Sequence, residues 1–180
     1  MEGPISATRI SRALMGYLRM RSQGSLITPN VYMPGSPWES DMVRVSKSYY
    51  YVEYEIKISV ADYRNDLKKR VSKYKTNSIT RHDFLKCGEQ HQMHDGWHVR
   101  QIPRPKQFYF VVPANLLADV LVPSHCGVIE FSTETRYAFG MEVTRKAPNL
   151  KNPTQMDIES VFNVGMKAAY KLRGADIETA

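Results

Sequence analysis

The run YYYVEYEIKIS at residues 49–59 constrains the fold of this chain more strongly than any other segment. Tyrosine, valine and isoleucine favour extended backbone, so we expect a strand over residues 49–58. Because side chains alternate between the two faces of a strand, the even positions form one face made only of tyrosine, valine and isoleucine. The odd positions include Glu53, Glu55 and Lys57, so the second face is charged. We therefore ask which groups or ligands this charged face contacts.

The preceding segment, ESDMVRVSKS, is predicted to form a hairpin with this strand across a loop at residues 47–49. Directly opposed residues in a hairpin point to the same side of the sheet. This register sets Asp41 opposite Glu55. Two steps nearer the loop, Val43 lies opposite Glu53. Two opposed carboxylates, with Cβ atoms roughly 5 Å apart, repel each other unless a cation lies between them.

A divalent cation suits the gap between these two carboxylates. Mg²⁺ favours one or two carboxylates together with water and phosphate oxygens. A neighbouring lysine can position the attacking water and offset the charge of the transition state. We therefore predict that Asp41 and Glu55 bind Mg²⁺ or Mn²⁺. Lys57, which the same register places opposite Glu39, is predicted to position the water.

These residues resemble the PD-(D/E)xK nuclease superfamily, in which a first acid precedes a hairpin and an acid-x-lysine motif follows on the next strand. Asp41 matches the first acid, and EIK matches the motif. The chain also resembles a group of small phage and bacterial nuclease-like proteins with the run EYEIKIS, followed by FYFVVP and KAP, here residues 108–113 and 146–148. The resemblance covers most of residues 38–150. It implies a restriction-endonuclease-like fold and a metal-dependent DNA endonuclease of phage or bacterial DNA processing.

The match departs from the superfamily pattern at two places. Ser40 precedes Asp41, where the pattern has proline. Many members also carry a metal-binding glutamate on the first helix, and that helix offers only Glu2 here. Glu39 or Glu53 is therefore the candidate for an additional metal ligand.

Three other interpretations stay open. The same fold could have lost its chemistry and bind DNA, or it could bind a host or phage protein partner. A regulatory protein that captures a host factor through a loop is a further possibility. Without the resemblance, the charged strand face is also explained by a solvated surface with cross-strand ion pairs. The sequence predicts no oligomeric state.

The strand leads directly into a predicted helix that begins at Ser59 and continues to Tyr74. Its basic side chains include Arg64, Lys68, Lys69, Lys73 and Lys75. They can lie along a DNA backbone, although a solvated helix face explains them equally well. Asp62 and Asp66 are interpreted as capping and helix-dipole residues. The chain has 25 Lys plus Arg against 18 Asp plus Glu, and its net charge of +7 favours a phosphate-bearing or acidic partner.

Residues 77–105 have no sustained periodicity and are predicted to form a long polar loop. A Cys-x3-His-x2-His-x3-His run within it consists of Cys87, His91, His94 and His98. Zinc could use these ligands, but the spacing matches no well-attested framework, and polar loop groups that contact substrate are the favoured alternative. His82 and His125 are interpreted as structural.

The remaining segments predict a single α+β domain over residues 1–180, with its core at about residues 5–150. An amphipathic helix occupies the first 21 residues, and LITPNVYMPGSPW is predicted to begin as a short edge strand and to continue into turns. QFYFVVP, CGVIEFS and YAFGMEVT read as further strands, and ANLLADVL as a short helix. A closing helix is expected from Thr154 to about residue 173. The order αβββαβαββα favours a three-layer α/β/α arrangement around a mixed central sheet.

Composition narrows the expected location of the protein. No apolar run approaches the length of a membrane span, so we expect no membrane partner. The chain has only two cysteines, and its first residues do not read as a signal peptide. We therefore expect a cytoplasmic protein, located in the cytoplasm of the bacterial host if a phage encodes it.

Overall fold

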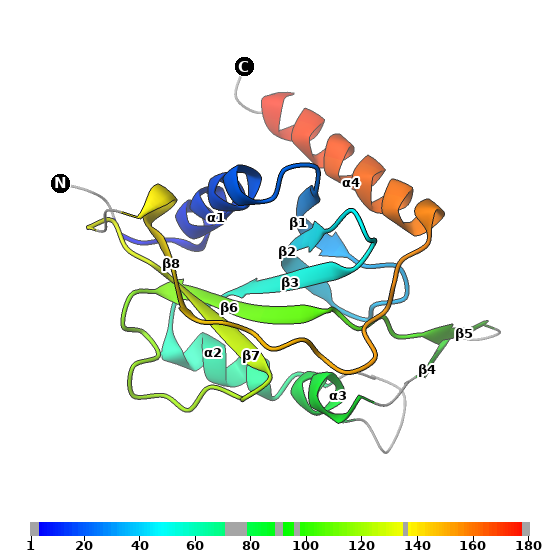
Figure 1. Ribbon diagram of the computed structural model, residues 1–180, viewed down its shortest axis with the longest axis horizontal. Coiled ribbons are helices and arrows are strands. Elements are labelled where there is room, and N and C mark those ends of the chain that lie inside the picture. The colour runs from blue at the N-terminus through cyan, green and yellow to red at the C-terminus, as the bar shows by residue number, and fades with distance from the viewer. Residues whose placement is uncertain (1–3, 71–78, 89–91, 96–97, 135–136, 178–180) are drawn as a thin grey trace.

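The computed structural model describes residues 4–70, 79–88, 92–95, 98–134 and 137–177, and its central element is a six-stranded sheet (Figure 1). In spatial order the strands are β1 (Leu26–Tyr32), β2 (Glu39–Val45), β3 (Tyr51–Ile56), β6 (Gln107–Pro113), β7 (Cys126–Phe131) and β8 (Met141–Arg145). β3, β6 and β7 run parallel to one another, whereas the other neighbours are antiparallel. This mixed sheet confirms the predicted fold class.

Helices lie on both sides of the sheet (Figure 1). The remaining elements are α1 (Ala7–Arg21), α2 (Val60–Leu67), α3 (Arg81–Cys87), the ribbon of β4 (Gln92–Asp95) and β5 (His98–Gln101), the short 3-10 helix η1 (Ala138–Gly140), and α4 (Ile158–Ile177). α1 covers one face, α2 and α3 cover the other, and α4 packs against the edge strand β1. Among the described residues, no helix is both long and apolar enough to span a membrane.

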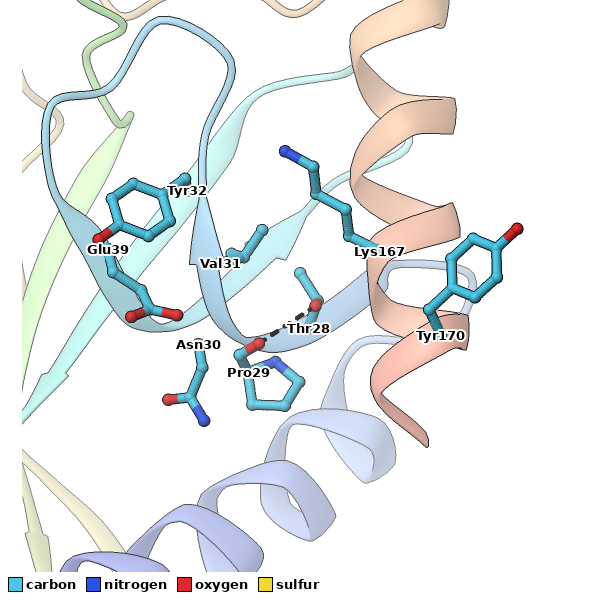
Figure 2. Close-up of a pocket in the computed structure, with 8 residues that line it drawn as sticks. All are labelled: Thr28, Pro29, Asn30, Val31, Tyr32, Glu39, Lys167 and Tyr170. Atoms are coloured by element: carbon cyan, nitrogen blue, oxygen red, sulfur yellow. Dashed lines mark hydrogen bonds between the residues drawn. The ribbon is translucent and has the colours of Figure 1, made fainter. Parts of the chain in front are cut away.

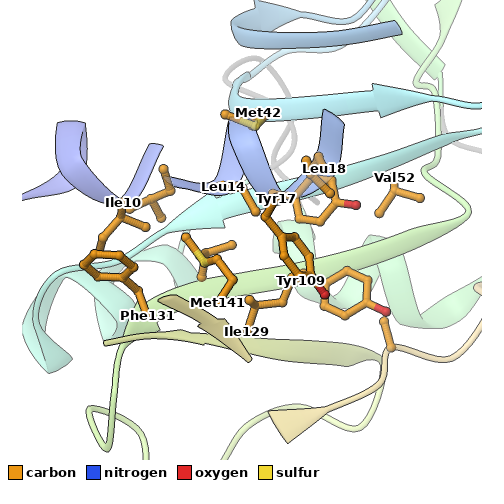
Figure 3. Packing of buried hydrophobic residues seen from close by; sticks show 14 residues of the cluster. Ile10, Leu14, Tyr17, Leu18, Met42, Val52, Tyr109, Ile129, Phe131 and Met141 are labelled. Atoms are coloured by element: carbon orange, nitrogen blue, oxygen red, sulfur yellow. The ribbon is translucent and has the colours of Figure 1, made fainter. Parts of the chain in front are cut away.

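The core beneath α1 is apolar throughout. α1 begins after Ser6, whose side chain accepts a hydrogen bond from the Arg9 backbone N–H at 3.2 Å. Its buried residues recur at helical spacing, and they are Ile10, Leu14, Tyr17 and Leu18. The sheet contributes Met42, Val52, Tyr54, Ile56, Tyr109, Val111, Ile129, Phe131 and Met141 to the same cluster (Figure 3). The predicted apolar face of the central strand is thus confirmed.

The core on the opposite face combines aromatic and charged side chains. Its apolar part includes Tyr63, Phe84, Leu85, Phe108, Phe110, Val112 and Val128. Glu53 and Glu55 of β3 stand directly beside two phenylalanines of β6 in the parallel ladder. The charged residues of the central strand therefore point into the layer beneath α2 and α3.

The helix after β3 is shorter than predicted. It ends at Leu67 instead of Tyr74, because the chain turns toward α3 immediately afterwards. The backbone N–H of Arg81 donates to the Lys69 carbonyl at 2.7 Å, which ties the end of α2 to the start of α3. This turn brings α3 alongside the charged face of β3.

The prediction of a long polar loop over residues 77–105 is wrong in part. α3 has a regular start, where the Thr80 side chain accepts a hydrogen bond from the Asp83 backbone N–H at 3.1 Å. It ends at Gly88, whose φ of 78° requires the left-handed conformation that glycine adopts easily. The helix is only seven residues long, too short for its periodicity to stand out from the sequence.

Three further boundaries differ from the predictions. Residues 114–121, expected to form a helix, form successive turns. α4 begins only at Ile158, because a β-bridge between Tyr50 and Gln155 holds the preceding segment extended. The strand expected in YAFGMEVT begins only at Met141, because η1 precedes it.

Candidate active site

The three charged residues of the central strand segment are buried. Glu53 and Glu55 are each 1% exposed, and Lys57 is 4% exposed. A solvated strand surface is therefore excluded as the explanation of these charges. A buried charge is costly unless it is paired, so each must find a partner inside the protein.

The predicted hairpin register is confirmed. The ladder pairs Val43 with Glu53, and the same register sets Asp41 opposite Glu55. The backbone N–H of Ile56 donates to Asp41 Oδ2 at 2.7 Å, which fixes this carboxylate at the end of β3. Burial, followed by the nearby charge of Glu55, raises the pKa of Asp41 to about 6. The two acids are thus close enough to repel each other.

Lys57 lies between two carboxylates. Its Nζ is 3.1 Å from Glu55 Oε2 and 3.1 Å from Asp66 Oδ1. Burial alone would lower the pKa of Lys57, but the charges of Glu55, Asp66 and Asp41 outweigh burial and raise it. Lys57 is therefore a cation at neutral pH. The predicted trio of Asp41, Glu55 and Lys57 comes together in one place.

Arg81, which the sequence did not single out, is the main buried counter-charge. Its Nη2 donates to Glu53 Oε1 at 2.6 Å and to Glu55 Oε1 at 2.8 Å. The guanidinium carbon lies 4.9 Å from the ring centre of Trp38 and 5.0 Å from that of Phe108. Burial would lower the pKa of Arg81, but the surrounding carboxylates raise it further above its usual range. The α3 helix thus neutralises the acids of β3.

Asp66 is also part of this cluster, which corrects its interpretation as a helix-dipole residue. Its side chain is fully buried, and Oδ1 lies 2.8 Å from Lys69 Nζ. Oδ2 lies 3.2 Å from Nε2 of His82. Burial would raise the pKa of Asp66, but these contacts and Arg81 hold it well below its usual range. Asp66 follows the buried Tyr63 by three positions, a spacing that places both on one helix face and could have predicted its burial.

The cluster contains one more acid than base. Its carboxylates are Asp41, Glu53, Glu55 and Asp66, and its cations are Lys57, Lys69 and Arg81. Asp41 is the carboxylate with the raised pKa, first because of its burial and then because of the nearby charge of Glu55. At pH 7 this excess favours an additional cation beside Asp41.

A cavity of about 280 Å³ opens next to Asp41. Its wall comes from the start of α1, from β1, from β2 and from the end of β3. It consists of Ala7, Thr8, Ser11, Arg12, Asn30, Asp41 and Ile56. The guanidinium of Arg12, two hydroxyl groups and an amide are all groups that bind phosphate oxygens. A carboxylate and phosphate-binding groups therefore share one cavity.

The two additional metal-ligand candidates do not line the cavity beside Asp41. Glu53 is fixed by Arg81, by Ser40 Oγ and by Trp38 Nε1, which donates to Glu53 Oε1 at 3.0 Å. Its role is to hold the buried arginine. Glu39 is exposed and lines a different groove, which β1 forms with Lys167 and Tyr170 of α4 (Figure 2). These positions leave Asp41 and Glu55 as the metal-ligand candidates.

Three of the five basic residues predicted to bind DNA are exposed. Arg64 lies on α2, Lys68 is the C-terminal capping residue, and Lys69 follows it. Lys69 also pairs with Asp66, so this basic surface reaches the edge of the charged cluster. Lys73 and Lys75 lie outside the described residues.

The predicted zinc run is only partly described. Cys87 ends α3, and its thiol donates to the Phe84 carbonyl at 3.4 Å. His94 lies on β4 and His98 on β5, whereas His91 lies outside the described residues. The zinc site in this run stays a prediction.

His82 and His125, interpreted as structural from the sequence, are in contact. Nδ1 of His82 lies 3.0 Å from Nε2 of His125, and Sγ of Cys126 lies 3.7 Å from the same Nδ1. Burial and the neighbouring His82 lower the pKa of His125 to about 4, so its ring is neutral at pH 7. These residues extend the buried polar cluster from Asp66 to the start of β7.

Comparison with known proteins shows a likeness in fold. The sequence matches no protein family and no curated protein. The chain is similar to a solved structure described as "SPO1766 protein of unknown function from Silicibacter pomeroyi", with a TM-score of 0.57 and 16% sequence identity. The similarity covers 97% of this chain and 90% of that one. At this level of identity the likeness shows a shared fold alone.

Proposed function

We propose that this protein is a metal-dependent phosphodiesterase that cleaves DNA, with Asp41, Glu55 and Lys57 at its centre. The observation that carries this proposal is the position of Asp41, which lies opposite Glu55 in the hairpin and lines the cavity that contains Arg12. A divalent cation at this position would relieve the repulsion between the two acids. The trio also matches the PD-(D/E)xK pattern that the sequence resembles.

The donor set fits Mg²⁺ or Mn²⁺. One oxygen of Asp41 is engaged by the Ile56 N–H, and the other is the candidate metal ligand. Glu55 Oε2 accepts from Lys57, and a carboxylate oxygen has a second lone pair for a metal. A bound divalent cation would lower the pKa of a water molecule and offset charge on the phosphoryl group.

The side chains around the two acids have complementary roles in this proposal. Lys57 is held as a cation between Glu55 and Asp66, where it orients the attacking water and stabilises developing negative charge. Arg12 and the hydroxyl groups beside it bind the phosphate oxygens of the substrate. The exposed basic residues of α2 contact the DNA backbone without reading its sequence.

A second candidate function is a DNA-binding module without catalysis. It is favoured by one observation, which is that both oxygens of Glu55 already have partners. Arg81 engages Oε1 and Lys57 engages Oε2, so the acid is neutralised without any metal. The same arrangement could therefore be a stable, inactive form of the fold.

The test is cleavage of supercoiled plasmid and single-stranded DNA with Mg²⁺, with Mn²⁺ and with EDTA. We expect nicking with either metal and none with EDTA. Asp41→Asn should reduce cleavage by about 100-fold or more, because it removes charge and keeps the hydrogen bond to Ile56. Glu142→Gln, at an exposed strand carboxylate of β8, is the matched control and should retain full activity. Salt-dependent DNA binding without cleavage under any metal would favour the inactive module.

A further inference from the structure

We propose that His82, His125 and Cys126 form a second metal site, specific for a transition metal of the Zn²⁺ type. It is separate from the Mg²⁺ site proposed at Asp41 and does not depend on nuclease activity. It also differs from the cysteine–histidine run predicted at residues 87–98. The ligands come from α3 and from the start of β7, which the fold brings together.

The three ligand atoms lie close enough together to bind one metal ion. All three lie within 4.8 Å of one another. The two histidine nitrogens are 3.0 Å apart, and Sγ of Cys126 is 3.7 Å from Nδ1 of His82. Zinc–nitrogen bonds of about 2.0 Å and zinc–sulfur bonds of about 2.3 Å at tetrahedral angles give separations of roughly 3.3 Å and 3.5 Å. The two separations that involve His82 Nδ1 differ from these values by a few tenths of an ångström, and the separation between His125 Nε2 and Cys126 Sγ, which is within 4.8 Å, would adjust to about 3.5 Å on metal binding.

The protein holds the His82 ring in the orientation that metal binding requires. Asp66 Oδ2 lies 3.2 Å from His82 Nε2, so this nitrogen donates its proton to the carboxylate and Nδ1 keeps a lone pair. A carboxylate behind a metal-binding histidine is a common second contact in zinc sites, where it fixes the tautomer. The ring also packs against Phe108 and Phe110, with centroid distances of 5.5 Å to each.

The chemistry of the other two ligands is compatible with a soft or borderline metal. Imidazole and thiolate are preferred by Zn²⁺ and Co²⁺, whereas Mg²⁺ prefers oxygen ligands. The Cys126 thiol would lose its proton to solvent on metal binding, and the thiolate would bond to the metal. His125 Nδ1 has no hydrogen-bond partner among the described residues. The contact with His82 is therefore the hydrogen bond that orients the His125 ring. Three protein ligands leave a fourth position for water or another small ligand.

The proposed site would link three elements of the fold. His82 is near the start of α3, Cys126 begins β7 directly after His125, and Asp66 belongs to α2. Through Asp66 the site also adjoins Lys57, so metal binding would stabilise the wall behind the candidate active site.

The test is a titration of the chelator-treated, full-length protein with Co²⁺, followed by absorption spectroscopy. We expect one Co²⁺ per chain, a thiolate-to-cobalt charge-transfer band, visible bands of tetrahedral intensity, and displacement by Zn²⁺ but not by Mg²⁺. Zn²⁺ should also raise the melting temperature. Absence of a stoichiometric cobalt spectrum in the wild-type protein would overturn the proposal.

Variants distinguish this site from the others. Cys126→Ser should remove the charge-transfer band, and His125→Asn should weaken Co²⁺ binding by at least about 10-fold. Cys87→Ser is the matched control, because it removes the other cysteine and should leave the spectrum unchanged. Loss of the band in Cys87→Ser and its retention in Cys126→Ser would assign the metal to the loop run instead. Asp41→Asn should retain the cobalt spectrum whether or not the nuclease proposal holds.

Discussion

The two faces of β3 are both buried, but different interactions stabilise them. On the face beneath α1, Tyr54 and Ile56 pack among apolar side chains. On the opposite face, Glu53 and Glu55 are equally buried but are held by Arg81 and other charged groups. The first face follows from hydrophobic burial, whereas the second depends on ion pairs between elements far apart in the sequence.

This difference suggests a division of roles. Apolar packing tolerates changes of shape at a moderate cost, because the interaction is non-directional. A buried charge cluster is sensitive to the loss of any one member, because the remaining charges lose their partners. It is also responsive to protons and cations, which is the property a metal site requires.

The largest effect on stability is expected for Arg81→Met. The substitution leaves Glu53 and Glu55 without their shared counter-charge, and we expect a loss of about 4 kcal/mol in the free energy of unfolding at pH 7. Urea denaturation measures it. The loss should be smaller at pH 5, because protons can replace the missing cation. An equal loss at both pH values would contradict the account of this face.

Leu14→Ala makes the corresponding change on the α1 face and should cost about 3 kcal/mol. Leu14 is fully buried in an apolar cluster. The loss therefore comes from the apolar atoms that are no longer buried and from the cavity that they leave behind. The same urea experiment should give the same loss at pH 5 and pH 7. A strong pH dependence here would mean that the two faces are not distinct.

Asp41→Asn should stabilise the metal-free protein at pH 7 by about 1 kcal/mol. The pKa of Asp41 is about 6 in the folded protein and about 4 in the unfolded chain, so its charge destabilises the fold. The contribution of Asp41 to wild-type stability is therefore fully present below about pH 4 and is lost as pH rises through 6, whereas the variant lacks this decline. Thermal unfolding from pH 4 to pH 8 checks the difference. A variant that is less stable than wild type at pH 7 would argue against excess charge at this position.

The smallest effect on stability is expected for the double substitution of Arg64→Gln and Lys68→Gln. Both side chains are exposed, so stability should change by less than about 0.5 kcal/mol. If both contact phosphates, the slope of log binding constant against log salt should fall by about 2. Fluorescence anisotropy with labelled DNA measures this slope. An unchanged slope would place the DNA surface elsewhere.

The sequence was sufficient for the parts of the fold that depend on local pattern. The alternation in YYYVEYEIKIS predicted the two faces of β3, and the loop at residues 47–49 predicted that Asp41 lies opposite Glu55. The burial of Asp66 could have been predicted by the same reasoning, because Asp66 follows Tyr63 by three positions on α2. These features depend on neighbours along one element or across one hairpin.

Partners from distant segments were not predictable in this way. Arg81 is separated from Glu55 by 26 positions, and it begins a helix of seven residues within a segment that lacks periodicity. His82 and His125 are 43 positions apart and meet only because α3 packs against the start of β7. Their contacts follow from how α3 packs on the sheet, and no local sequence pattern predicts that packing.

Binding of Mn²⁺ to the wild-type protein and to Asp41→Asn, followed by electron paramagnetic resonance at pH 7, tests the central claim most directly. The account predicts that the wild type binds Mn²⁺, that Mg²⁺ competes for the same position, and that Asp41→Asn weakens binding by at least about 10-fold. Glu142→Gln should bind as the wild type does. Equal Mn²⁺ binding by wild type and Asp41→Asn, or none by either, would contradict a divalent-metal site between Asp41 and Glu55.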